Sequence, residues 1–140
     1  MKCQLDIIKI ADSKLDAAEC LLLNDFIDDA YYLGGYTIEL LLKARVCKIL
    51  GIDNFFEDSF LSKLKNHQAY KIHDLRQLLI FSGLYIAHGH ESQDPTFKAN
   101  WSVILNWNEG HRYMIGKTVT EVKNFLISVK EIATWIKKHL

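Results

Sequence analysis

Near its C-terminal third, the chain gathers side chains that could bind a phosphate and an aromatic base. The segment NWNEGHRYM holds a polar-aromatic cluster of Trp107, Glu109, His111, Arg112 and Tyr113. A guanidinium can hold a phosphate through two parallel hydrogen bonds while neighbouring rings stack on a base. In the alternative interpretation, Arg112 forms an ion pair with Glu39 on another helix, and the aromatic rings fill the end of a bundle. The sequence leaves both interpretations open.

A second candidate is the dipeptide His73-Asp74, at the start of an expected helix. Histidine beside aspartate can form a base and the group that orients it, since imidazole exchanges protons near neutral pH. Adjacent side chains at a helix start diverge, however, and aspartate is a common N-cap. We therefore assign Asp74 a structural role and keep His73 as a candidate ligand contact. His73 is also a catalytic candidate, together with His111 and Arg112.

The histidines and cysteines predict no metal site, and no cofactor is expected. His88 and His90 form an H-x-H pair, which binds a metal only if a third ligand comes from elsewhere, and none can be identified. We expect the stretch 88–93 to be a solvated, turn-like loop. The cysteines match no zinc spacing and are expected to be buried free thiols: Cys3, Cys20 and Cys47. A glycine-rich phosphate loop, a nucleophile elbow and a zinc-protease motif are all missing.

Length and charge limit the classes of protein to which the chain can belong. Its 140 residues fit one domain, 1–140. The 17 basic residues balance 17 acidic ones, so the chain as a whole does not attract nucleic acid, although a local patch can. No uncharged apolar run reaches the ~20 residues that a membrane span needs. Charged residues also interrupt the apolar N-terminal stretch. We expect a cytoplasmic protein without a membrane role.

Apolar residues recur at helical spacing along most of the chain, and strand patterns are nearly absent. The pattern predicts helices over 4–23, 28–50 and 74–81, and two more that begin at 95 and 118. We expect an all-α, up-and-down bundle of four to five helices, with the long first, second and last helices packed nearly antiparallel. A long connection over 52–72 should cover an end of the bundle or a partner with Phe55, Phe56, Phe60, Leu61 and Leu64.

The second helix, which contains AYYLGGYTIELLLKARVCK, carries apolar residues around most of its circumference. This pattern predicts a central helix that is covered on several sides. Gly34 and Gly35 lower helix propensity by roughly 1 kcal/mol each, so we expect a neighbouring helix to approach closely there. Glu39 and Lys43 stand four residues apart in the order that favours an ion pair. Gly51 is expected to end this helix.

Short polar signals predict the helix starts. Asp28 or Asp29 is placed to cap the second helix. Asp94 precedes a proline, as an N-cap does before a proline at the first helical position. Thr118 and Glu121 have the spacing of a capping box. Apolar steps of three and four then predict the buried faces of the first and last helices: Leu5, Ile8, Ala11, Leu15, Ala18 and Leu22 in the first, and Val119, Val122, Leu126, Val129, Ala133 and Ile136, widened by Phe125 and Ile132, in the last.

Three segments, in this order, resemble the HEPN family (higher eukaryotes and prokaryotes nucleotide-binding). Residues 30–48 are similar to the family's central helix, and KIHDLRQLLIFSGL, 71–84, is similar to its His-Asp-Leu segment. FKANWSVILNWNEGHRY, 97–113, is similar to a late segment that ends in Arg-Tyr. With WIKKHL at the C-terminus, the likeness covers nearly the whole chain. It implies a HEPN-like helical bundle, commonly a homodimer, often encoded with a small nucleotidyltransferase in toxin–antitoxin or defence settings.

The resemblance also implies nucleotide binding and, for many bacterial HEPN domain-containing proteins, metal-independent RNase activity. Those RNases use an arginine followed, after four to six residues, by a histidine, and the paired motifs meet at the dimer interface. This sequence departs from the pattern, because no histidine lies in that window after Arg45, Arg76 or Arg112. Whether the chain is an enzyme is therefore left open.

The leading hypothesis is a non-catalytic HEPN-like module that dimerises and binds a nucleotide, an RNA or a partner nucleotidyltransferase. The alternatives are a metal-independent RNase with a non-standard Arg/His site, and a purely structural assembly subunit. The candidate ligand contacts are Arg112, Tyr113, His73, Lys43 and Trp107, with Glu39 and Asp74 in structural roles.

Overall fold

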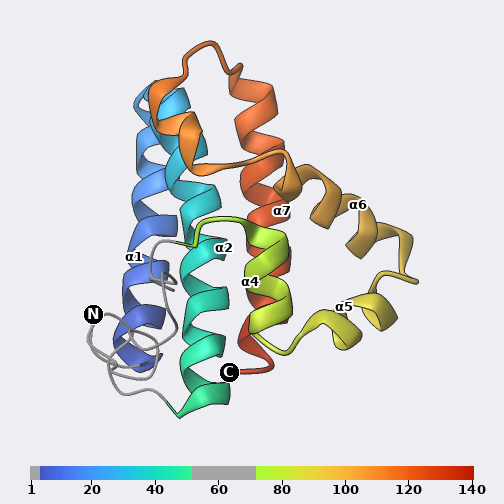
Figure 1. The fold of residues 1–140 in the computed structure, drawn as a ribbon. Helices are drawn as coiled ribbons and strands as arrows, with labels where there is room; N and C mark the ends of the chain where they lie inside the picture. Colours follow the sequence, from blue (N-terminus) through green and yellow to red (C-terminus); the bar gives the residue numbers. More distant parts are fainter. Residues whose placement is uncertain (1–3, 52–71) are drawn as a thin grey trace.

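The computed structural model describes residues 4–51 and 72–140, and every regular element in these ranges is a helix (Figure 1). The predicted all-α bundle is confirmed, although the described residues already hold more helices than the four to five expected. The predicted connection 52–72 lies almost wholly outside the described residues, as do its phenylalanines and Cys3. The elements are α1 Gln4–Leu23, α2 Ile27–Leu50, α4 Leu75–Phe81, α5 Tyr85–Glu91, α6 Pro95–Leu105, the 3-10 helix η2 Glu109–Tyr113 and α7 Val119–Lys137.

The central helix is α2, which packs against α1, α4, α7 and η2. As Figure 1 shows, α1 runs antiparallel to α2, whereas α7 runs in the same direction as α2. The contacts agree, because Tyr31 near the start of α2 meets Phe125 early in α7, and Arg45 near the end of α2 donates to the carbonyl of His139, just after α7. The antiparallel prediction is therefore right for α1 and wrong for α7 relative to α2. The chain returns through α6 and η2 to the end where α2 begins before α7 starts.

The buried faces explain which helix is central. Five apolar side chains within residues 38–44 of α2 have no exposed surface, so the prediction of a helix covered on several sides is confirmed: Ile38, Leu40, Leu41, Leu42 and Ala44. The predicted face of α7 is also buried, except that Val119 is exposed in its first turn. Along α1 only Ile7, Ala11 and Ala18 are buried, and Leu5 is exposed. Ile8, Leu15 and Leu22 are partly buried and pack against the core, so the predicted face of α1 is confirmed except for Leu5. Burial is only partial because α1 packs mainly against the single neighbour α2.

Most predicted helix ends are confirmed. Asp74 accepts a hydrogen bond from the backbone of Gln77, and Asp94 caps α6 ahead of its proline. Thr118 and Glu121 form the capping box of α7, while Gly51 ends α2 in the left-handed conformation.

The predicted cap of α2 is wrong. The N-cap is Phe26, whose side chain makes no capping bond, and Asp28 and Asp29 lie inside the first turn. The carboxylate of Asp28 instead accepts hydrogen bonds from the backbone N–H groups of Gly116 and Lys117. Asp28 therefore holds the turn that leads into α7. Its negative charge also interacts favourably with the positive end of the α2 helix dipole.

The H-x-H segment is a helix, not the expected loop. His88 lies in α5, with its ring edge-to-face against Phe97 and Trp101 and near Trp135. Its Nε2 is buried without a hydrogen-bond partner in the described part of the chain. Burial lowers the pKa of His88, so the imidazole is held neutral as part of an aromatic cluster. His90 is exposed.

The two described cysteines differ. Cys47 is buried, as predicted, whereas Cys20 is exposed on the outer face of α1, so the expected burial is wrong there. None of the described helices combines the length and the apolar character that crossing a bilayer requires.

The glycine pair has the packing role that the sequence predicts. A Cβ at Gly34 would lie 2.5 Å from Leu126 of α7, which confirms the close helix approach. A Cβ at Gly35 would lie 2.3 Å from the ring of Trp107. At Gly35 the neighbour is thus a rigid indole and not a helix backbone.

We expect Gly35→Ala to lower the free energy of unfolding by about 1–3 kcal/mol, because overpacking against Trp107 exceeds the gain of up to about 1 kcal/mol in helix propensity. The matched control is Gly89→Ala in α5, where a Cβ would meet nothing within 4 Å. This control should raise the free energy of unfolding. Urea denaturation measures both changes, and equal stabilisation by the two alanines would contradict the packing of Trp107 on α2.

The stability of the protein should fall in acid partly through His88. Because burial lowers the pKa of His88 in the folded state, the unfolded chain takes up this proton at higher pH. As the pH falls below about 6.5, protonation therefore favours unfolding. We expect the free energy of unfolding of His88→Gln to fall less than that of wild type between about pH 7.5 and 5.5, with His90→Gln as the control. An unchanged pH dependence in His88→Gln would contradict the buried neutral ring.

Candidate functional site

A buried charge lies at the middle of α2. Glu39 has no exposed surface and Lys43 is 3% exposed, and the Lys43 ammonium lies 2.7 Å from Glu39 Oε1. The predicted ion pair is confirmed. It is buried, although the i,i+4 spacing is equally compatible with a pair on the helix surface. The second carboxylate oxygen, Oε2, is also buried and has no hydrogen-bond partner within the described ranges. Burying an ionised carboxylate costs free energy unless an opposite charge or a hydrogen-bond donor pairs with it. The Glu39 carboxylate therefore requires Lys43 and its other neighbours to stay within contact distance.

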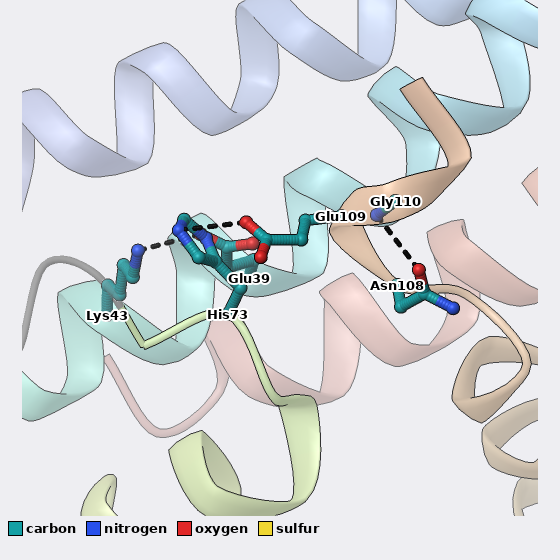
Figure 2. Close-up of polar contacts among 6 residues, drawn as sticks. All are labelled: Glu39, Lys43, His73, Asn108, Glu109 and Gly110. Carbon is teal, nitrogen blue, oxygen red and sulfur yellow. Dashed lines mark hydrogen bonds and ion pairs between the residues drawn. The ribbon is translucent and has the colours of Figure 1, made fainter. Parts of the chain in front are cut away.

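His73 connects this buried charge to η2. Its Nδ1 lies 2.9 Å from Glu39 Oε1 and its Nε2 lies 3.0 Å from Glu109 Oε2, so the ring stands between the two carboxylates (Figure 2). Both contacts are hydrogen bonds only when both ring nitrogens carry protons. Both ring nitrogens of His73 are thus occupied by contacts with carboxylates. Asp74, its neighbour, caps α4 as predicted.

The local structure of η2 follows from Asn108. Its side chain accepts a hydrogen bond from the backbone of Gly110, 2.9 Å away, as Figure 2 shows. His111 completes the capping box, since its Nδ1 accepts from the backbone N–H of Asn108 at 3.1 Å. Ahead of Asn108, Trp107 is buried, and its indole N–H donates to the carbonyl of Tyr32. Trp107 thus anchors η2 on α2, and only 3% of its surface is left exposed for a ligand.

Arg112 and Tyr113 lie on the outer side of η2, where both are exposed. The guanidinium carbon of Arg112 lies 4.8 Å from the centroid of the Tyr113 ring. Hydrogen bonding to Tyr113, followed by the contribution of Tyr32, raises the pKa of Arg112. The interpretation that pairs Arg112 with Glu39 is wrong, because Glu39 is paired with Lys43 and His73. Among the described residues, no carboxylate lies within ion-pair distance of Arg112.

An aromatic row on α2 runs from Arg112 towards the buried charge. The rings of Tyr32 and Tyr36 are stacked at 6.1 Å, and Tyr32 also faces Trp107 at 6.0 Å. Burial, and next the charge of Glu39, raise the pKa of Tyr36. The site thus combines a surface cation, partly buried rings and a buried ion pair along one side of α2. Sequence analysis did not single out Tyr32 or Tyr36, although both lie in the aromatic start of the central helix.

The contacts of His73 with Glu39 and Glu109 form a bridge from α2 to η2. A pocket of about 200 Å³ lies next to this bridge, between the start of α4 and the end of α6. Its walls include three of the predicted residues, His73, Asp74 and Trp107, together with Arg76 and Asn108. Lys43, Arg112 and Tyr113 do not line it. The candidates therefore fall into two groups, one around the bridge and one on the outer side of η2. No hydrogen bond within the described ranges joins His73 to His111 or Arg112. Those ranges also hold no group of three or more His, Cys, Asp and Glu side chains that could bind a metal ion.

Comparison of the chain with protein-family models, with curated proteins and with solved structures finds no match. The HEPN resemblance and what it implies for function thus stay predictions from the sequence. The site has to be interpreted from its own geometry.

The buried ion pair predicts an asymmetric response to mutation. Lys43→Met leaves the Glu39 carboxylate without its nearest cation, and we expect a loss of about 3 kcal/mol in the free energy of unfolding. Replacing both residues, in Glu39→Met/Lys43→Met, should recover part of this loss, because a well-packed apolar pair often substitutes for a buried ion pair.

The matched control for this pair is Lys130→Met. It breaks the exposed ion pair of Lys130 with Glu19 and should change stability by no more than about 1 kcal/mol. Urea denaturation of the three variants and of wild type would measure the difference. A Lys43→Met variant as stable as Lys130→Met would contradict the burial of the charge.

Proposed function

We propose that the chain is a non-catalytic, HEPN-like module that binds a nucleotide through Arg112 and Tyr113 on the outer side of η2. In this proposal it acts as a homodimer with a partner nucleotidyltransferase, in a toxin–antitoxin or defence setting, as the sequence resemblance implies. It works inside the cytoplasm. The observation that carries the proposal is the exposed Arg112 guanidinium stacked on an exposed tyrosine ring.

The chemistry of this surface suits a phosphate next to a base. Arg112 has no ion-pair carboxylate among the described residues, and its five N–H donors outnumber its hydrogen bonds to Tyr113 and Tyr32. Donors therefore remain for a phosphate, which a guanidinium binds through two hydrogen bonds. Tyr113 is 79% exposed, which leaves a ring face to stack on a base. Such stacking is worth about 1–3 kcal/mol per base. The neutral net charge of the chain argues against broad binding to polyanions and favours a local, specific contact.

The same geometry supports the non-catalytic part of the proposal over an RNase. A general base needs a free lone pair within reach of the substrate. Both ring nitrogens of His73 face carboxylate oxygens, and Nδ1 of His111 belongs to the capping box of η2. Neither imidazole forms a hydrogen-bonded pair with Arg112 in the described structure. Arg112 is therefore proposed as a binding residue.

We expect isothermal titration with ATP and GTP to show saturable binding of at least one nucleotide. Arg112→Ala should weaken it by about tenfold or more, because charge-assisted hydrogen bonds are worth about 1.5–3 kcal/mol each. Tyr113→Ala should weaken it through the lost stacking. Lys98→Ala, which removes an exposed cation from α6, is the control and should bind like wild type. The absence of heat with both nucleotides, or wild-type affinity in Arg112→Ala, would contradict the proposal.

The dimer in this proposal is supported by apolar side chains at the end of the bundle where α2 and α4 stop. Six of them are between 46% and 74% exposed. A Cβ added to Gly83, which follows α4, would lie 3.1 Å from the side chain of Ile49 in α2. The ends of α2 and α4 are therefore close together. A patch of this kind on one end of a small domain is typical of an interaction surface. Its residues are Ile49, Leu50, Ile80, Phe81, Tyr85 and Ile86.

We expect light scattering to give the mass of a dimer for wild type and of a monomer for Ile86→Glu, because a charge in the apolar patch would be desolvated without a partner. Ile115→Glu is the control and should stay dimeric. Ile115 is 92% exposed and lies in the turn before α7, at the opposite end of the bundle from the patch. A monomeric wild type would remove the dimer from the proposal. A dimeric Ile86→Glu would move the interface elsewhere.

A further inference from the structure

A second pocket, of about 250 Å³, lies at the end of the bundle where α2 and α7 begin. Figure 1 shows the starts of these two helices close to η2 at this end. The pocket is lined by side chains from all three elements and from the turn over 114–118. Arg112 and Tyr113 do not line it, so it is separate from the surface proposed for a nucleotide.

One acidic side chain of the pocket is fully used in building its wall. The two oxygens of Asp28 accept hydrogen bonds from the backbone N–H groups of Gly116 at 3.2 Å and Lys117 at 2.9 Å. These donors lie far along the chain from Asp28, so the carboxylate fixes the turn against the start of α2. Two N–H dipoles directed at the carboxylate offset its negative charge.

The second acidic side chain is held by the start of α7. Oε2 of Glu121 accepts hydrogen bonds from the backbone and the hydroxyl of Thr118, at 2.8 and 3.1 Å. These hydrogen bonds lower the pKa of Glu121. The carboxylate stands in the first turn of a long helix, where the positive end of the helix dipole offsets its charge.

Two further polar groups of the pocket are donors to which the described residues supply no acceptor, the Tyr31 hydroxyl and the Lys117 ammonium. Tyr31 is only 4% exposed, and its hydroxyl, which makes no hydrogen bond within the described ranges, lies at the accessible part of the residue. Burial, and next the charge of Glu121, raise the pKa of Tyr31 to about 12, so the hydroxyl keeps its proton. The Lys117 ammonium lies 4.5 Å from the centroid of the Tyr31 ring, and no carboxylate of the described residues is within ion-pair distance. The His111 ring packs edge-on against Tyr31.

We propose that this pocket binds a small oxyanion, the carboxylate or phosphate group of a small molecule, through the Lys117 ammonium and the Tyr31 hydroxyl. Asp28 accepts from two backbone N–H groups and Oε2 of Glu121 accepts from Thr118, whereas the Lys117 ammonium and the Tyr31 hydroxyl are donors to which the described residues supply no acceptor. A carboxylate or phosphate supplies acceptor oxygens and a charge opposite to that of Lys117. The volume lies below the roughly 300 Å³ at which pockets for drug-sized ligands begin, which limits the ligand to a small molecule.

The test is an NMR titration of the whole chain with sodium phosphate and, separately, with sodium acetate, at an ionic strength held constant with sodium chloride. We expect saturable shifts of the Gly116 and Lys117 amides with at least one anion, at a dissociation constant on the order of 1 mM. Phosphate and acetate distinguish the two ligand sources. Lys117→Met should weaken binding by about tenfold or more, since it removes the charge. Tyr31→Phe keeps the ring and should weaken binding by several-fold through the lost hydroxyl.

Lys123→Met removes an exposed cation from α7 outside the pocket and should bind the anion like wild type. Arg112→Ala should also bind like wild type, which separates this pocket from the proposed nucleotide surface. Shifts that do not saturate with either anion, or equal affinity in Lys117→Met and wild type, would overturn the proposal. The amide chemical shifts of Lys117→Met outside the turn should match those of wild type. This match shows that the variant is folded and that its weaker binding does not come from a loss of structure.

Discussion

Glu39 lies at the centre of the fold with none of its surface exposed. An ionised carboxylate in this position is costly unless it is paired, and breaking a buried pair costs about 3–5 kcal/mol. Lys43 supplies the charge from the same helix, and His73 brings a second donor from the segment ahead of α4. Through its other nitrogen His73 reaches Glu109, so the pairing of one buried charge also holds η2. The surface that we propose for a nucleotide is therefore positioned from the core of the bundle.

The fold is predictable from the sequence where local signals decide the structure. The capping box at Thr118, the N-cap at Asp94 and the glycine at the end of α2 all act within one helical turn. Sequence analysis fails at α5, because a glycine and polar residues around His88 suggest a loop. The helix there is stabilised by packing of His88 on aromatic rings of α6 and α7, such as Trp101. Tertiary contacts of this kind override local propensity.

The site is predictable only where its contacts are close in sequence. The pair of Glu39 with Lys43 follows from their spacing on one helix. The contact of His73 with Glu39 joins residues 34 positions apart, and no periodicity predicts which carboxylate a histidine will meet. Arg112 shows the same limit, since its residue type indicates phosphate binding but only the fold shows that it is exposed and stacked on Tyr113. Glu109 belongs to the polar-aromatic cluster visible in the sequence, but no spacing there predicts its contact with His73.

Amide hydrogen exchange of η2, compared between wild type and Glu109→Ala, tests most directly the claim that the buried charge holds this segment. The variant removes the link from His73 to η2 and leaves Glu39 and Lys43 intact. We predict faster exchange of the His111 and Met114 amides, which donate to backbone carbonyls of Asn108 and His111, with unchanged exchange in α7. Unchanged exchange at both η2 amides would contradict the claim and leave Trp107 as the anchor of η2.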